Sequence, residues 1–96
     1  MRPALLTEEE LSAGLAALPG WRREGEFIHR TFRFPDFAAA FAFMTAVAVD
    51  AEELDHHPDW SNVYDRVEVR LSTHDAGGLT RLDLELAGRI DARAAG

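Results

Sequence analysis

The fold of this chain is decided by residues 36–73, which read DFAAAFAFMTAVAVDAEELDHHPDWSNVYDRVEVRLST. In the first half of this stretch, apolar side chains recur every three or four residues, which is the spacing of a helix with one buried stripe. Asp36 is a typical N-cap, and Pro58 disfavours the α conformation at His57, so the helix is predicted to stop just before His57. The predicted stripe consists of Phe37, Phe41, Met44, Val47 or Ala48, Ala51 and Leu54.

The second half of this stretch has a different period. Residues 67–73 alternate between apolar and polar side chains, which is typical of a half-buried strand. Residues 60–64 form the strand before it, and Asp65-Arg66 is the predicted tight turn between the two. Because so short a connection cannot cross over to a parallel neighbour, the two strands are predicted to be antiparallel.

Residues 7–34 show the same order of a helix followed by two strands. Thr7 and Glu10 have the spacing of a capping box, and the leucines at 11, 15 and 18 follow on one helical face. Residues 21–23 and 27–34 are predicted to form a hairpin, because the segment between them contains a glycine flanked by two glutamates.

A last helix is predicted to begin at Thr80, with Asp83 in the acidic position of a second capping box. Its apolar stripe is Leu79, Leu82, Leu86 and Ile90. The complete order is αββαββα over a single domain, residues 1–96. This order predicts an α+β fold, a four-stranded antiparallel sheet with three helices packed on one face. The other face, or a sheet edge, is left for self-association.

Composition excludes several classes of protein. The net charge is −7, and the ten basic residues, all arginine, are scattered, so a nucleic-acid surface is not expected. There is no cysteine, which excludes disulfides, zinc–thiolate sites and a thiol nucleophile. The most apolar stretch, residues 37–49, is too short to span a bilayer, and the N-terminus has no apolar run of signal-peptide length. We therefore expect a cytoplasmic protein without a membrane segment.

Three of the four histidines bracket the two strands of residues 60–73. An antiparallel pair returns the chain to its starting end, so His56 and His57 are expected to meet His74 in space. Histidine titrates near neutrality, so such a group can supply both a proton donor and a proton acceptor. Glu52 lies four residues before His56 and could orient its ring. Asp83, at the start of the last helix, could hold His74 or the N–H groups of a substrate.

The spacing of these residues resembles the signature of a known family. Glu52, the run His56-His57-Pro58, Tyr64, His74 and Asp83 together resemble the signature of the pterin-4a-carbinolamine dehydratases. The strings DHHPDWSNVY, residues 55–64, and LSTHDAGGLT, residues 71–80, are similar to the same family. The αββαββα order agrees with the fold that this resemblance implies.

The resemblance implies removal of water from a 4a-hydroxytetrahydropterin to give a quinonoid dihydropterin, in support of an aromatic amino-acid hydroxylase. The reduced pterin is the substrate, and no cofactor or metal is expected. His56 and His74 are the expected acid/base pair, His57 mainly binds and orients, and Glu52 and Asp83 orient the histidines. Pro58 and Tyr64 are expected to shape the site. The substrate-binding positions implied are His56, His57, Pro58, Thr73, His74, Asp75 and Ala76.

Two other functions compete with this one. The alanine-rich helix of residues 36–55 could dock a partner, which fits a non-catalytic dimerisation cofactor or an assembly factor of the same fold. His56, His57, His74 and Asp83 are also metal ligands by type, but adjacent histidines rarely hold one ion together. We expect a homo-oligomer. Sheet-edge pairing would give a homodimer, and packing of the 36–55 helices would give a homotetramer.

Overall fold

The computed structural model describes residues 3–96, and it confirms the αββαββα order and the four-stranded antiparallel sheet. The helices and strands are α1 (Glu8–Ala16), β1 (Arg22–Glu24), β2 (Phe27–Arg33), α2 (Phe37–Leu54), β3 (Asp59–Val63), β4 (Arg66–Leu71) and α3 (Arg81–Ala95), with a short 3-10 helix (His74–Ala76) before α3. Among these residues, no helix has both the length and the apolar composition that a membrane span requires.

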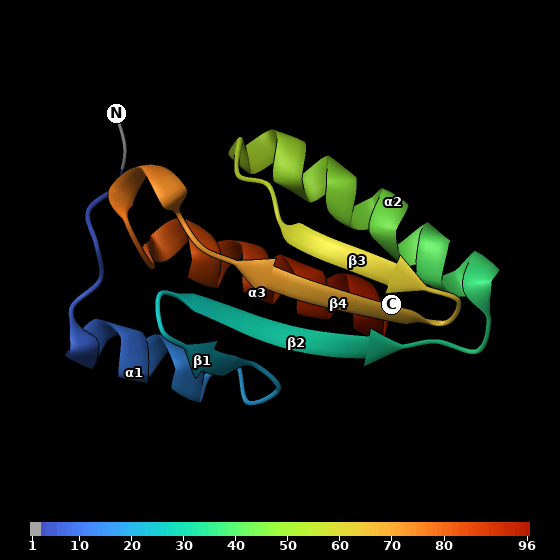
Figure 1. Ribbon diagram of the computed structural model, residues 1–96, viewed down its shortest axis with the longest axis horizontal. Helices are drawn as coiled ribbons and strands as arrows, with labels where there is room; N and C mark the ends of the chain where they lie inside the picture. Colours follow the sequence, from blue (N-terminus) through green and yellow to red (C-terminus); the bar gives the residue numbers. More distant parts are fainter. Residues whose placement is uncertain (1–2) are drawn as a thin grey trace.

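The strands lie in the order β1-β2-β4-β3, so the two hairpins join through a long-range β2–β4 pair (Figure 1). In that pair Ile28 lies opposite Leu71 and Phe32 opposite Val67. These residues and Val69 are buried on the face that the helices cover, where they pack with apolar side chains of α2 and α3. Because successive side chains of a strand point to opposite faces, the polar residues between them line an open face.

The predicted helix starts are confirmed. Thr7 and Glu10 form a capping box, and the Asp36 Oδ1 accepts a hydrogen bond from the Ala39 N–H at 2.8 Å. At the start of α3, Thr80 is the N-cap and the Asp83 carboxylate accepts from the Thr80 N–H. These bonds satisfy backbone donors of the first helical turn, which have no partner inside the helix.

The predicted buried stripe of α2 is partly wrong. Phe37 and Phe41 are 49% and 55% exposed, while Phe43 is buried between Phe32 and Phe34 with ring-centroid distances of 5.0 and 4.8 Å. The buried residues of α2 are Ala40, Phe43, Val47, Asp50 and Ala51. Alanine, phenylalanine and valine occupy most faces of this helix, so several stripes satisfy the helical period. Only packing against the sheet selects the stripe that is buried.

The turn between β3 and β4 lies one residue earlier than predicted. It is formed by Tyr64 and Asp65, and Tyr64 adopts a left-handed conformation with φ of 51°. The β3–β4 turn lies at the end of the sheet opposite to the segments that join α2 to β3 and β4 to α3 (Figure 1), and Tyr64 in this turn is 62% exposed. The prediction that Tyr64 shapes the site is therefore wrong for this chain.

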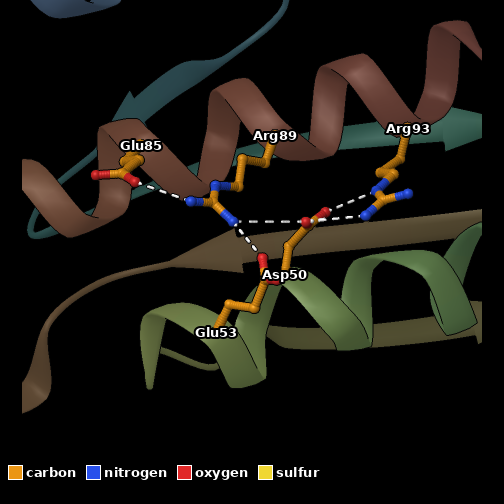
Figure 2. Close-up of polar contacts among 5 residues, drawn as sticks. All are labelled: Asp50, Glu53, Glu85, Arg89 and Arg93. Carbon is orange, nitrogen blue, oxygen red and sulfur yellow. Dashed lines mark hydrogen bonds and ion pairs between the residues drawn. The ribbon is translucent and has the colours of Figure 1, made fainter.

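A buried carboxylate that the sequence analysis did not single out joins α2 to α3. Asp50 is 4% exposed, and both of its oxygens are bound by Arg93, through Nε at 2.8 Å and Nη2 at 3.1 Å (Figure 2). Arg89 lies 3.7 Å from the same carboxylate. The Arg93 hydrogen bond is the main cause that lowers the pKa of Asp50, while burial opposes it. The two helices are thus held together by a charged contact as well as by apolar packing.

Changing Asp50 to Asn should lower the free energy of unfolding by about 1–3 kcal/mol near neutral pH. The ionised Asp50 contributes stability above its unfolded-state pKa of about 4, and this is lost as the pH falls through the lower folded-state pKa. Urea unfolding of both proteins should therefore show a difference that shrinks in acid. Glu85→Gln, which removes an exposed partner of Arg89, is the matched control. A difference that does not change with pH would contradict this account.

Candidate active site

The candidate site lies at one end of the sheet. There the segment that connects α2 to β3 lies near the segment that connects β4 to α3 (Figure 1). The structure places the three histidines of these two segments around a single hollow, which we call the histidine cleft. It is lined by Asp55, His56, His57, Ser72, Thr73, His74 and Asp75.

His56 is bound to a buried carboxylate. Its Nε2 lies 2.6 Å from the Oδ1 of Asp83, and the two residues are 8% and 0% exposed. A hydrogen bond of this length needs a proton on the ring nitrogen or on the carboxylate, so the pair holds a proton between two groups screened from water. Since Nε2 is engaged, Nδ1 is the ring nitrogen of His56 that remains to act on a ligand.

The other oxygen of Asp83 is satisfied as well. Its Oδ2 accepts from the Thr73 hydroxyl at 2.9 Å and from the Thr80 N–H at 2.9 Å, and the two threonine hydroxyls are 2.8 Å apart. A buried carboxylate is tolerated only when its oxygens are hydrogen-bonded. This network therefore holds Asp83, and through it His56, in one position.

Glu52 contacts His57, and the predicted pairing of Glu52 with His56 is wrong. The Oε2 of Glu52 lies 2.6 Å from the Nε2 of His57, and both side chains are largely exposed. The cause is the end of α2, where Asp55 adopts a left-handed conformation with φ of 49°. The chain leaves the helix at this residue, so the four-residue spacing no longer places His56 above Glu52 and the ring turns toward α3 instead.

His74 begins the short 3-10 helix and is exposed. Its ring has no hydrogen bond or ion pair with any of residues 3–96. Of the two roles suggested for Asp83, holding His74 is wrong, because the Asp83 oxygens are bound by His56, Thr73 and Thr80. His74 is free to turn toward a ligand in the cleft.

A second hollow begins at the same histidines and runs onto the open face of the sheet. This sheet cleft is lined by Glu26, Phe27, His57, Asp59, Arg70, Leu71, Ser72 and His74. The guanidinium of Arg70 lies over the ring of Phe27, 4.0 Å from its centroid. Sequence reasoning missed Glu26, Phe27, Asp59, Arg70 and Ser72. Phe27, Asp59 and Arg70 lie on strands, where alternation gives the face of the sheet but not the neighbouring strand, and Glu26 and Ser72 lie just outside the strands.

Of the predicted substrate-binding residues, five line the histidine cleft: His56, His57, Thr73, His74 and Asp75. Pro58 and Ala76 are half-buried and line neither the histidine cleft nor the sheet cleft. Thr73 was predicted as a binding position, and in the structure its hydroxyl donates a hydrogen bond to Asp83.

The model of the family described as pterin 4 alpha carbinolamine dehydratase matches residues 4–93. The chain belongs to this dehydratase family. Curated relatives bear the name pterin-4-alpha-carbinolamine dehydratase, marked as provisional. That of Rhizorhabdus wittichii is 55% identical over 91 residues, which are 93% of this chain and 94% of the relative. That of Sinorhizobium fredii is 51% identical over 98 residues, with 100% and 93% covered.

Two solved structures resemble this member of the dehydratase family. The transcriptional coactivator/pterin dehydratase from Brucella melitensis has a TM-score of 0.90 and 48% identity, with 94% of this chain and 98% of that chain covered. A pterin dehydratase-like protein described as a RuBisCO assembly factor in the alpha-carboxysome has a TM-score of 0.69 and 28% identity, with 80% and 92% covered. The same fold thus carries two kinds of described role.

In this dehydratase-family chain, the signature residues form two carboxylate–histidine pairs of different character. The Asp83–His56 pair is buried and held by threonines, whereas the Glu52–His57 pair is exposed. A carboxylate on one ring nitrogen selects the tautomer and the orientation of the imidazole. The site therefore combines one rigid histidine, one paired surface histidine and one unrestrained histidine around a common hollow.

Proposed function

We propose that this protein dehydrates a 4a-hydroxytetrahydropterin to the quinonoid dihydropterin and water. The observation that carries this proposal is the buried 2.6 Å contact between His56 and Asp83 beside a hollow that His74 also lines. Membership of the dehydratase family supports it independently. Reduced pterin is then the substrate, and an aromatic amino-acid hydroxylase is the class of enzyme that supplies it.

The reaction needs two proton movements. The C4a–O bond breaks, and the hydroxyl takes up a proton and leaves as water, while a ring N–H gives up its proton to complete the new double bond. Protons balance and no electron is exchanged with another molecule, so one general acid and one general base complete the step. We assign these two roles to His56 and His74, which both line the histidine cleft. His56 is held by Asp83, whereas the ring of His74 has no hydrogen bond within residues 3–96.

The remaining residues position these groups in our proposal. Asp83 holds His56, and Glu52 holds His57, which binds and orients the pterin. Asp75 and the backbone around Pro58, Thr73 and Ala76 complete the binding site that family membership implies. The exposed face of α2 around Phe37 and Phe41 is where we expect copies of the chain to associate.

The test is a coupled assay in which an aromatic amino-acid hydroxylase generates the 4a-hydroxy species and its decay is followed by ultraviolet absorbance. The wild-type protein should accelerate this decay in proportion to its concentration. Protein heated beyond unfolding is the control for non-specific buffer catalysis. If the 4a-hydroxy species decays at the uncatalysed rate in the presence of the wild-type protein, the proposal is wrong.

A second candidate function is assembly of a partner protein. It is favoured by the likeness to the RuBisCO assembly factor and by the exposed aromatic residues Phe37 and Phe41 on α2. A protein of this kind would form a stoichiometric complex with one partner and leave the 4a-hydroxy species untouched. Phe41→Ser should then abolish this complex, whereas a protein that acts only as a dehydratase has no such complex to lose.

A further inference from the structure

Two oppositely charged side chains on the open face of the sheet lie opposite each other without pairing. Asp59 and Arg70 are register partners in the β3–β4 ladder. Side chains at such positions have Cβ atoms about 5 Å apart, a distance at which opposite charges normally form a cross-strand pair. Within residues 3–96, however, neither side chain has an ion pair or a hydrogen bond. Their charges therefore remain available to a ligand.

Arg70 is held away from Asp59 by an aromatic ring. Its guanidinium lies over Phe27, the first residue of β2, 4.0 Å from the ring centroid. Phe27 lies beyond His29, the register partner of Arg70, in the direction of the histidines. A guanidinium that is stacked on a ring keeps its N–H groups free at the edge of its plane. Arg70 thus presents donors toward the catalytic end of the sheet.

Both charged residues share the sheet cleft with His57 and His74. The volume of this cleft, about 180 Å³, is below the roughly 300–1,000 Å³ of a pocket that encloses a drug-sized ligand. A bicyclic ligand would therefore be only partly enclosed by this cleft. A ligand that contacts both histidines in this cleft would also lie next to Phe27, Asp59 and Arg70.

The pattern of donors and acceptors matches one edge of a pterin. The amino-pyrimidinone edge carries two adjacent donors, the 2-amino group and N3–H, followed by the C4 carbonyl as an acceptor. A carboxylate can accept both N–H groups at once, and a guanidinium can donate to the carbonyl. C4 is bonded to C4a, where the hydroxyl leaves, so a pterin held by this edge places its reacting carbon next to the gripped carbonyl.

We propose that Asp59 and Arg70 together read the amino-pyrimidinone edge and so select pterins over other bicyclic rings. This inference rests on the proposed dehydratase function and adds the residues that determine specificity. Asp59 distinguishes the 2-amino group from a carbonyl, because a carbonyl oxygen in that place would face the carboxylate with no proton between them. Arg70 donates to the C4 carbonyl, so it does not distinguish a ring with the 2-amino group from a ring with a carbonyl in that place.

The test uses two stable ligands that differ at this one group, 6-methyl-7,8-dihydropterin and 6-methyl-7,8-dihydrolumazine. Titration calorimetry with the full chain should show the wild type binding the pterin at least about 10-fold more tightly, since sites that bind a substrate N–H reject the analogue that lacks it. Asp59→Asn should lose this preference, because the amide can donate to the lumazine carbonyl. Arg70→Gln should weaken both ligands about equally.

Matched controls lie on the same open face. Glu68→Gln and Arg33→Gln remove the same charges from strand positions outside the sheet cleft, and both should leave the preference unchanged. In the coupled assay Asp59→Asn should raise KM about 10-fold with kcat nearly unchanged, which is the signature of uniform binding. If Asp59 had only a structural role, Asp59→Asn would lower the free energy of unfolding. We expect instead that this variant unfolds at the same urea concentration as the wild type.

The outcomes separate this inference from the proposed function. A wild type that dehydrates and an Asp59→Asn variant that keeps both affinity and preference would overturn the inference and leave the function standing. A wild type that prefers the pterin but does not accelerate the decay would overturn only the function. Failure of the wild type to bind either ligand also overturns the inference.

Discussion

Asp83→Asn should reduce kcat for pterin dehydration by about 10²–10³-fold, within the range that general acid/base catalysis contributes. The carboxylate of Asp83 faces the Nε2 of His56 at 2.6 Å. An amide in its place would direct either its N–H groups or an uncharged oxygen at the ring, so it would change the tautomer of His56 or lose the charge that supports the imidazolium. Asp83 touches no substrate in our proposal and acts through His56.

Because Asp83 is fully buried, the same substitution should also lower the free energy of unfolding, by about 3 kcal/mol. Asp91→Asn on the same helix is the matched control. Asp91 accepts hydrogen bonds from Trp21 and Arg30 away from the site, so its loss should cost stability and leave kcat intact. The nitrogen-15 shifts of the His56 ring would report the tautomer directly. If Asp83→Asn kept the wild-type kcat and the wild-type ring shifts, Asp83 would be only a helix cap.

His74→Ala should lower kcat by about 10²-fold while changing the free energy of unfolding by less than about 0.5 kcal/mol. The ring is exposed and has no hydrogen bond or ion pair within residues 3–96, so its removal leaves no buried group unsatisfied. The variant combining His56→Ala with His74→Ala should show no acceleration above the uncatalysed decay. Since the cleft is open at His74, added imidazole should restore part of the activity of His74→Ala.

His29→Ala is the matched control for His74→Ala. His29 lies on β2, and its nearest carboxylate is that of Glu24 at 3.7 Å, outside both clefts that contain His74. This variant should keep the wild-type kcat and stability. Full activity in His74→Ala would remove His74 from the mechanism and leave His56 and His57 as the remaining histidines of the cleft.

The histidines of the candidate site were predictable from the sequence, and the carboxylates that contact them were not. The spacing of His56, His57 and His74 around two antiparallel strands was enough to bring them to one end of the sheet. Which carboxylate each histidine would meet depended on the left-handed turn at Asp55, which redirects His56 from α2 to α3. Asp and Glu are both common near helix ends, so no local sequence pattern indicated that His56 contacts Asp83 and His57 contacts Glu52.

The sequence by itself determined the order of the elements, the caps at Thr7, Asp36 and Thr80, and the family signature. Each of these depends on residues a few positions apart, where helical and extended geometry set the distances. Only the tertiary structure decided the pairing of β2 with β4, the exposure of Phe37 on α2, and the contact of His56 with Asp83 across 27 positions. Those outcomes follow from which apolar faces pack together, and many faces of an alanine-rich helix satisfy the same local pattern.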